Sequence, residues 1–241
     1  MQAKLNTFFD RVYVINLKSR LDRRAEVCAQ LQRIGLSFDS PGVVLREVTK
    51  PTDAAGFPSV GARGCFMSHL ALLREAKEER LTSVLILEDD LNFCDQFSSR
   101  FSAVAQQLKT VEWGMFYGVY VLDAPLEDSA SPCLKVDPRL VIGTSAFVAI
   151  NGEHIHLLVE YLAAMLKRPA GDAHGGPMHI DGAYQWFRQS HPQISTWLAH
   201  DQLGFQRSSR TDVHSVRWYD RASWSAWIVS RLRRLRNRTR R

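Results

Sequence analysis

The strongest constraint on the fold is a run of four aliphatic residues, Val84 to Leu87, that ends directly in Glu88, Asp89 and Asp90. A short apolar run of this kind is typical of a strand that is buried on both faces of a sheet. In an open α/β sheet, ligands bind beyond the carboxyl ends of the strands. The sequence therefore predicts a buried strand that delivers three carboxylates to a ligand-binding edge.

Side chains alternate along an extended chain, so Glu88 and Asp90 are expected on one side and Asp89 on the other. Two carboxylates placed in this way form an oxygen site for Mg²⁺ or Mn²⁺, and such a cation can in turn bind phosphate oxygens. The alternative is that the three acids cap the following segment or simply face solvent. The triplet alone does not decide between these interpretations.

The apolar patterns around this run predict helices that alternate with short strands. Strands are expected at 12–17, 43–48, 113–121 and 140–150, and helices at about 19–34, 62–79, 97–108 and 153–166. Ser19 and Asp22 form the S-x-x-D pattern of a capped helix start, and Gly35 is the expected stop. The alternation favours an α/β fold with a mixed, mainly parallel sheet flanked by helices.

The net charge of +6 does not indicate a specific nucleic-acid protein, because the charge is concentrated at one end of the chain. Residues 231–241 hold seven arginines and no acid, and the rest of the chain has 24 basic against 25 acidic residues. The basic character therefore belongs to a tail and not to a face of the fold.

Other sequence signals predict a folded protein that stays where it is synthesised. The apolar share of 45% is enough for a substantial core. The first apolar run, residues 12–17, is too short for a signal peptide, and no run approaches the length of a membrane span. The four cysteines form no CxxC pair, which favours reduced thiols over a zinc ribbon or a disulfide framework.

Three motifs resemble those of glycosyltransferase family 25, the family of lipooligosaccharide and collagen galactosyltransferases. They are VINLKSRLDRR at 14–24, GCFMSHL at 64–70 and LILEDD at 85–90, and they occur in the family's order and spacing. The resemblance is strongest over residues 12–92. It implies a GT-A fold, a UDP-sugar donor and inverting, metal-dependent transfer of a hexose, with galactose as the first choice.

The resemblance also implies roles for the acids and for the end of the first strand. Asp90 is expected to bind the metal, Glu88 to contact the metal or the ribose, and Asp89 to support either. Asn16, Leu17 and Arg20 lie where the first strand meets its helix, a position suited to the nucleobase and ribose.

Three arginines of the first helix region are candidates for the diphosphate, since a guanidinium binds phosphate in a planar fork. Arg20 is the preferred contact, whereas Arg23 and Arg24 are expected on a solvated helix face. Ser68 and His69 are assigned to the donor site. They are helical neighbours that diverge by about 100°, so they are not a nucleophilic pair. His69 is expected either to reach a strand-end carboxylate or the diphosphate, or to be a core residue that orients the acidic loop.

An inverting transfer needs a general base on the acceptor hydroxyl. The candidate is Asp181, which lies just before an apolar helix, and its alternative role is a plain helix N-cap. Asp172 is the second candidate for the base. One late histidine, His200 or His214, is expected to complete the metal shell, and the sequence does not choose between them.

The chain from Ser223 onward reads as an appended amphipathic helix in which Trp224, Trp227 and Leu232 alternate with arginines. This composition predicts binding to an anionic membrane surface. We therefore expect a catalytic domain at 1–222 and a membrane-association tail at 223–241, with a cytoplasmic location on the inner face of the membrane. The alternative for the tail is a disordered basic segment that binds nucleic acid nonspecifically.

The leading prediction is a transferase that moves a hexose to a saccharide acceptor, in particular the lipopolysaccharide core. One alternative is a metal-dependent phosphoryl-transfer or hydrolytic enzyme that uses the same acids. The other is a non-catalytic module that recruits a partner to the membrane.

Overall fold

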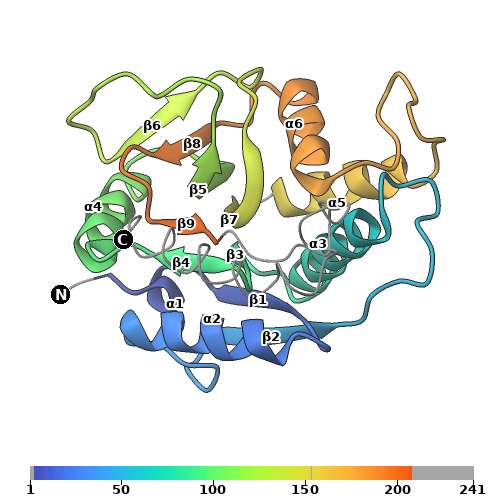
Figure 1. Ribbon diagram of the computed structural model, residues 1–241. Coiled ribbons are helices and arrows are strands. Elements are labelled where there is room, and N and C mark those ends of the chain that lie inside the picture. The colour runs from blue at the N-terminus through green and yellow to red at the C-terminus, as the bar shows by residue number, and fades with distance from the viewer. Residues whose placement is uncertain (1–2, 153, 208–241) are drawn as a thin grey trace.

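The computed structural model describes residues 3–152 and 154–207 as one α/β unit (Figure 1). The described elements, in chain order, are α1 (Leu5–Phe8), β1 (Arg11–Leu17), α2 (Leu21–Arg33), β2 (Val43–Val48), α3 (Val60–Glu78), β3 (Ser83–Glu88), β4 (Leu91–Phe93), α4 (Phe97–Leu108), β5 (Met115–Val121), β6 (Cys133–Val136), β7 (Gly143–Asn151), α5 (His154–Met165), α6 (Ile180–Ser190), β8 (Thr196–Ala199) and β9 (Gly204–Gln206). The helix expected from residue 223 lies outside the described residues.

The main sheet has the strand order β2-β1-β3-β7-β5-β8-β6. The β1–β2, β1–β3 and β5–β8 pairs are parallel, whereas the β3–β7, β5–β7 and β6–β8 pairs are antiparallel. The expected mixed sheet with flanking helices is confirmed, although parallel pairs are only half of the neighbouring pairs. β7 lowers the share of parallel pairs because it lies between β3 and β5 and runs antiparallel to both.

The aliphatic run of β3 lies in the middle of the core, as its sequence predicts. Val84 and Ile86 pack on one face of the sheet with α3, α5 and α6, and Leu85 and Leu87 pack on the other face with α1, α2 and α4. All four side chains are fully buried. The strand is thus fixed on both faces and in register with β1 and β7, so its end has little freedom to move.

The start of α2 differs from the predicted capping pattern. Its N-cap is Arg20, with no side-chain capping bond, and Asp22 accepts two hydrogen bonds from the Arg20 guanidinium instead. The predicted Ser19–Asp22 capping box is therefore wrong. The predicted stop at Gly35 is confirmed, since Gly35 has a φ of 72° and the Leu36 N–H donates to the carbonyl of Leu31.

A second, two-stranded sheet forms from β4 and β9, which are both too short to be recognised from sequence patterns. Gly204 faces Phe93 across this pair, and a Cβ at Gly204 would lie 2.1 Å from the backbone oxygen of Asn92. The close approach brings residues 204–207 against the turn that follows β3. Among the described helices, none is long and apolar enough to cross a membrane.

Candidate active site

The acidic triplet lies at the carboxyl end of β3, but it does not continue the strand. β3 ends at Glu88, and Asp89 and Asp90 form a turn that leads into β4. Arg23 of α2 meets both turn residues, with Nη1 3.0 Å from Asp89 Oδ1 and 3.6 Å from Asp90 Oδ2. The predicted strand alternation therefore stops at Glu88, because a turn has no two-residue period.

Arg23 does not lie on a solvated face, so that expectation is wrong. Its side chain is 11% exposed, and its charge lies between two carboxylates. Arg20 pairs with Asp22, and the half-exposed Arg24 pairs with Glu47. Of the three arginines, Arg23 is therefore the one that the fold directs to the acids.

Asp89 is held by two donors from the first strand-helix unit. Asn16 Nδ2 donates to Asp89 Oδ2 at 2.7 Å, and Arg23 donates to Asp89 Oδ1. Asn16, which the sequence places at the donor site, is fully buried beneath the acid. Its contact with Asp89 makes it a support for the turn.

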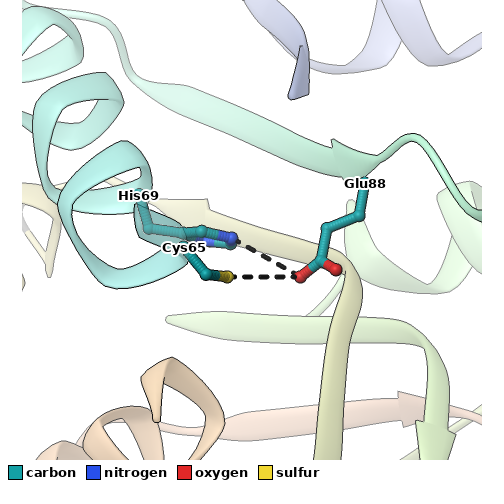
Figure 2. A group of neighbouring side chains, drawn as sticks. All are labelled: Cys65, His69 and Glu88. Carbon is teal, nitrogen blue, oxygen red and sulfur yellow. Dashed lines mark hydrogen bonds and ion pairs between the residues drawn. The ribbon is translucent and has the colours of Figure 1, made fainter. Parts of the chain in front are cut away.

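The Glu88 side chain faces α3 and takes no part in the hydrogen bond between Arg23 and Asp89. Ser145 Oγ donates to Glu88 Oε1 at 2.5 Å, while His69 Nε2 and Cys65 Sγ lie 3.7 Å and 3.9 Å from the same oxygen (Figure 2). Burial raises the pKa of Glu88, but His69 and Ser145 lower it by more, so its pKa lies below the ordinary value. Glu88 is therefore held as a carboxylate.

His69 is fully buried and makes a 2.8 Å hydrogen bond from Nδ1 to the Tyr184 hydroxyl of α6. Of the two roles predicted for His69, the structure places it beside the strand-end carboxylate of Glu88. Ser68 Oγ donates to the carbonyl of Gly64 one turn earlier in α3.

Asp90 is the most electrostatically crowded of the three acids. Burial, followed by the negative charge of Glu88, raises the pKa of Asp90 to about 7. Gln206 Nε2 lies 3.3 Å from both carboxylate oxygens, and the Arg207 N–H donates to the Asp90 carbonyl at 2.7 Å. A buried carboxylate whose ionisation is opposed by neighbouring acids favours the approach of a cation.

Sequence reasoning did not identify Gln206 and Arg207 as site residues. Arg207 donates to Asn92 Oδ1 at 3.0 Å and to the Asp89 carbonyl, and it pairs with Glu26 at 3.1 Å. The side chain thus connects the end of β9 to the acidic turn and to α2. The sequence signal for both was the segment QRSSRTDV at 206–213, which resembles a late Q-x-x-x-S-D-I motif of glycosyltransferase family 25.

A pocket opens beside the turn. Its lining includes four predicted donor-site residues, Leu17, Ser68, Glu88 and Asp89. The other lining residues are Ile15, Arg23, Val48, Thr49, Lys50, Pro51, Gly61, Gly64 and Cys65. The ends of β1 and β2, the start of α3 and the end of β3 thus form one cavity.

Asp181 lies in the first turn of α6, where the N-cap is His179, so the N-cap alternative for Asp181 is wrong. Its carboxylate accepts the Gly182 N–H at 2.8 Å and the Thr144 N–H at 3.4 Å. Thr144 has a φ of 67°, a conformation that costs energy for a β-branched residue. Its hydroxyl donates to Gln206, which contacts Asp90, so hydrogen bonds connect Asp181 to the acidic turn.

The other predicted residues have partners elsewhere. Asp172 accepts the His174 N–H within its own loop. His200 Nε2 lies 3.2 Å from the Glu127 carbonyl oxygen, and its Nδ1 lies 4.0 Å from Asp201. His214 lies outside the described residues.

Comparison with known proteins agrees with this geometry. The model of glycosyltransferase family 25, described as an LPS biosynthesis protein, matches residues 53–129. This match and the curated relatives support the assignment of the chain to glycosyltransferase family 25. The matched segment contains α3, β3 and the acidic turn, and therefore one wall of the pocket.

Curated relatives of the chain include procollagen galactosyltransferases and proteins whose names call them inactive. Procollagen galactosyltransferase 1-A of Xenopus laevis is 28% identical over 127 residues, which cover 45% of this chain and 21% of that protein. Inactive glycosyltransferase 25 family member 3 of Homo sapiens is 27% identical over 127 residues, with the same coverage. The chain spans about a fifth of the length of these relatives.

A solved structure has a fold similar to that of the chain. The glycosyltransferase involved in the glycosylation of the major capsid of PBCV-1 matches with a TM-score of 0.50 and 10% identity, over 83% of this chain and 94% of that one. The mixed sheet with flanking helices is thus a GT-A-like fold.

The crowding at Asp90 predicts a stability effect that depends on pH. The folded-state pKa of about 7 lies above the unfolded value, so ionised Asp90 destabilises the fold increasingly as pH rises toward 7. In EDTA, Asp90→Asn should therefore raise Tm, and by more at about pH 8 than at about pH 5. The exposed Asp123→Asn is the control. A lower Tm of Asp90→Asn at the higher pH would contradict the interpretation that burial and the neighbouring acids oppose the ionisation of Asp90.

Proposed function

We propose that the chain is a glycosyltransferase that moves a hexose, galactose, from a UDP-sugar to a saccharide acceptor. The observation that carries this proposal is the acidic turn at the carboxyl end of β3, which lies inside the family-matched segment and borders the pocket. Such an edge is where an α/β sheet binds its ligands. Two features support the proposal together: a site suited to the leaving diphosphate, and a GT-A-like fold.

The residues that line the pocket have chemistry suited to a nucleotide sugar. Arg23 and Lys50 supply positive charge for phosphate oxygens, while Leu17 and Val48 supply apolar surface for a nucleobase. Arg23 is proposed to bind the diphosphate while keeping its contact with Asp89. This assignment replaces Arg20, whose guanidinium is occupied by Asp22.

Mn²⁺ or Mg²⁺ is the proposed cofactor, held by Asp90 and by Glu88. The crowded carboxylate of Asp90 fits a hard divalent cation, which prefers oxygen ligands. When bound, the cation would supply Lewis-acid stabilisation of the diphosphate that departs. Asn16 and Arg23 would keep Asp89 in place beside it.

Asp181 is proposed as the base that takes the proton of the acceptor hydroxyl. Its position at the start of α6 fixes the backbone, and the Gly182 and Thr144 N–H groups orient its carboxylate. The hydrogen bonds through Thr144 and Gln206 fix Asp181 relative to Asp90. A base fixed on the acceptor side is what an inverting displacement requires.

The proposed acceptor is the lipopolysaccharide core, in keeping with the description of the matched family model as an LPS biosynthesis protein. A lipid-linked acceptor agrees with the tail at 223–241, which we propose to bind anionic headgroups from the cytoplasmic side. The domain boundary near residue 222 is part of this proposal. The tail lies outside the described residues.

A non-catalytic binding module is the second candidate, because relatives that carry the word inactive in their names match this chain about as well as procollagen galactosyltransferases do. Such a protein would keep the pocket and lose turnover. A phosphoryl-transfer or hydrolytic enzyme using the same acids is a further alternative, and it would act on UDP-sugars without any benefit from an acceptor.

A screen of UDP-sugars with Mn²⁺ tests the proposed activity. UDP release should be highest with UDP-galactose, should rise when a saccharide acceptor is added and should fall by at least about 100-fold in Asp90→Ala, which removes the proposed metal ligand. Asp123→Ala is the matched control. UDP-galactose binding without UDP release would favour the binding module, and full activity of Asp90→Ala would refute the metal assignment.

Substitution of the proposed base should separate turnover from binding. Asp181→Asn keeps the size of the side chain but removes its basicity, so kcat should fall by about 100-fold or more while the Kd for UDP stays near that of the wild type. Asp172→Asn provides the comparison and should keep near-normal kcat. Weakened UDP binding with near-normal kcat in Asp181→Asn would contradict the assignment.

Removal of residues 223–241 tests the membrane proposal. The truncated protein should no longer sediment with anionic liposomes, because the inserted tryptophans and the arginines are lost, but it should still act on a soluble acceptor. Neutral liposomes are the control. Unchanged sedimentation with anionic liposomes would disprove the role of the tail.

A further inference from the structure

A cluster on the α3 side of β3 brings together a thiol, an imidazole and a carboxylate (Figure 2). Cys65 and His69 are four residues apart on α3, so they lie on one face of the helix and point toward Glu88 at the end of β3. Cys65 Sγ, one ring nitrogen of His69 and a Glu88 oxygen all lie within 4.8 Å of one another. These donors differ from those of the acidic turn, which are all oxygens.

His69 provides an independent indication of a ligand. Its side chain is fully buried, and Nε2 has no hydrogen-bond partner among the described residues. Nε2 points toward Glu88, at a distance of 3.7 Å that is too long for a hydrogen bond. A buried ring nitrogen left without a bond is costly, and an atom placed between His69 and Glu88 would remove that cost.

The other ring nitrogen of His69 has the environment that a metal ligand needs. Nδ1 lies 2.8 Å from the Tyr184 hydroxyl, which fixes the orientation of the ring and directs Nε2 into the cluster. Metal-bound histidines almost always have such a partner on the second nitrogen. Ser145 orients Glu88 in the same way, through its 2.5 Å hydrogen bond to Oε1.

We propose that Cys65 Sγ, His69 Nε2 and Glu88 Oε1 bind a thiophilic divalent cation, Zn²⁺, at a site that shares only Glu88 with the oxygen site proposed at Asp90. A thiolate with an imidazole favours zinc over Mg²⁺ or Mn²⁺, which prefer oxygen. Three protein ligands leave one tetrahedral position, as in zinc sites that bind water or a substrate. Cys65 and Glu88 line the pocket, so this fourth position is accessible from it.

Two of the three ligand–ligand distances require only small adjustments. Zinc bonds of ordinary length at a tetrahedral angle place a nitrogen and an oxygen ligand about 3.4 Å apart, and a sulfur and an oxygen ligand about 3.6 Å apart. The observed separations are 3.7 Å from Nε2 to Oε1 and 3.9 Å from Sγ to Oε1. Both are within a few tenths of an ångström of the values for a bound ion.

Binding has a simple proton balance. Burial and the negative charge of Glu88 raise the pKa of the Cys65 thiol well above its ordinary value, so the free protein holds the proton. The cation takes the thiolate and one proton is released to solvent, whereas His69 binds in its neutral form. The site does not depend on glycosyl transfer, so its test remains valid if the proposed function fails.

Cobalt is the probe for this site, because a thiolate bound to Co²⁺ gives a charge-transfer absorption in the near ultraviolet that oxygen ligands do not give. The full-length protein, in a phosphine reductant without chelator, should show this band with one equivalent of Co²⁺ and lose it when Zn²⁺ is added. Zn²⁺ should also raise the Tm of the wild type by binding only the folded state. No band in the wild type would overturn the proposal.

Variants identify the ligands. Cys65→Ser should abolish the band, whereas Cys28→Ser, on α2, should keep it. Tyr184→Phe should keep the band but weaken Co²⁺ binding by about 10-fold or more, because it removes the partner of Nδ1. Asp90→Asn should keep the band, because Asp90 supplies none of the three ligand atoms. The proposal would be wrong if the band survived in Cys65→Ser or disappeared in Asp90→Asn.

A folding defect in Cys65→Ser would not confuse this result. Circular dichroism in EDTA measures its fold without metal, and Cys65→Ala provides a second variant that removes the sulfur without adding a polar group. If both variants fold and the Zn²⁺-dependent rise in Tm persists in both, the proposal is wrong.

Discussion

The site depends on how negative charge is buried at the end of β3. An ionised carboxylate is costly in a protein interior unless it is paired or hydrogen-bonded, and here two adjacent acids, Asp89 and Asp90, are both more than nine-tenths buried. Arg23 from α2, Asn16 from β1 and Gln206 from β9 supply the compensating contacts. Three segments that are distant in the sequence therefore converge on one turn.

The surroundings of β3 shift the pKa values of Glu88 and Asp90 in opposite directions. Glu88 has its pKa held below the ordinary value by His69 and Ser145, against the effect of burial, whereas burial and the charge of Glu88 raise that of Asp90. Environments that separate the pKa values of adjacent carboxylates also separate their chemical roles. Glu88, Asp89 and Asp90 are consequently not equivalent ligands. Their spacing in the sequence suggests instead that Glu88 and Asp90 form a pair of equivalent ligands separated by Asp89.

The strand β3 and the helix α3 follow from local patterns. Aliphatic residues 84–87 are sufficient to predict a strand buried on both faces, and Gly35 to predict where α2 ends. Contacts such as that of Gln206 with Asp90, 116 residues apart in the chain, depend on the pairing of β4 with β9, and each of those strands has only three residues. Strands of that length have no detectable period.

Other failures have a local physical cause. The Ser19–Asp22 pattern fits a cap, but the Arg20 guanidinium competes successfully for the Asp22 carboxylate. The role of Arg23 was missed because helical spacing gives the direction of a side chain but not the position of a partner on another element. The four-residue spacing of Cys65 and His69 was visible in the sequence, but its meaning depends on Glu88, which only the packing of α3 on β3 brings near.

The antiparallel direction of β7 has a consequence for how this fold can diversify. Because β7 runs opposite to β3, the residues that enter it, Thr144 and Ser145, lie beside the residues that leave β3. The segment between β6 and β7 therefore ends beside the acids, but it does not line the pocket that β1, β2, α3 and β3 form. Insertions or exchanges in that segment would reshape the side near Asp181 and leave the pocket formed by β1, β2, α3 and β3 unchanged.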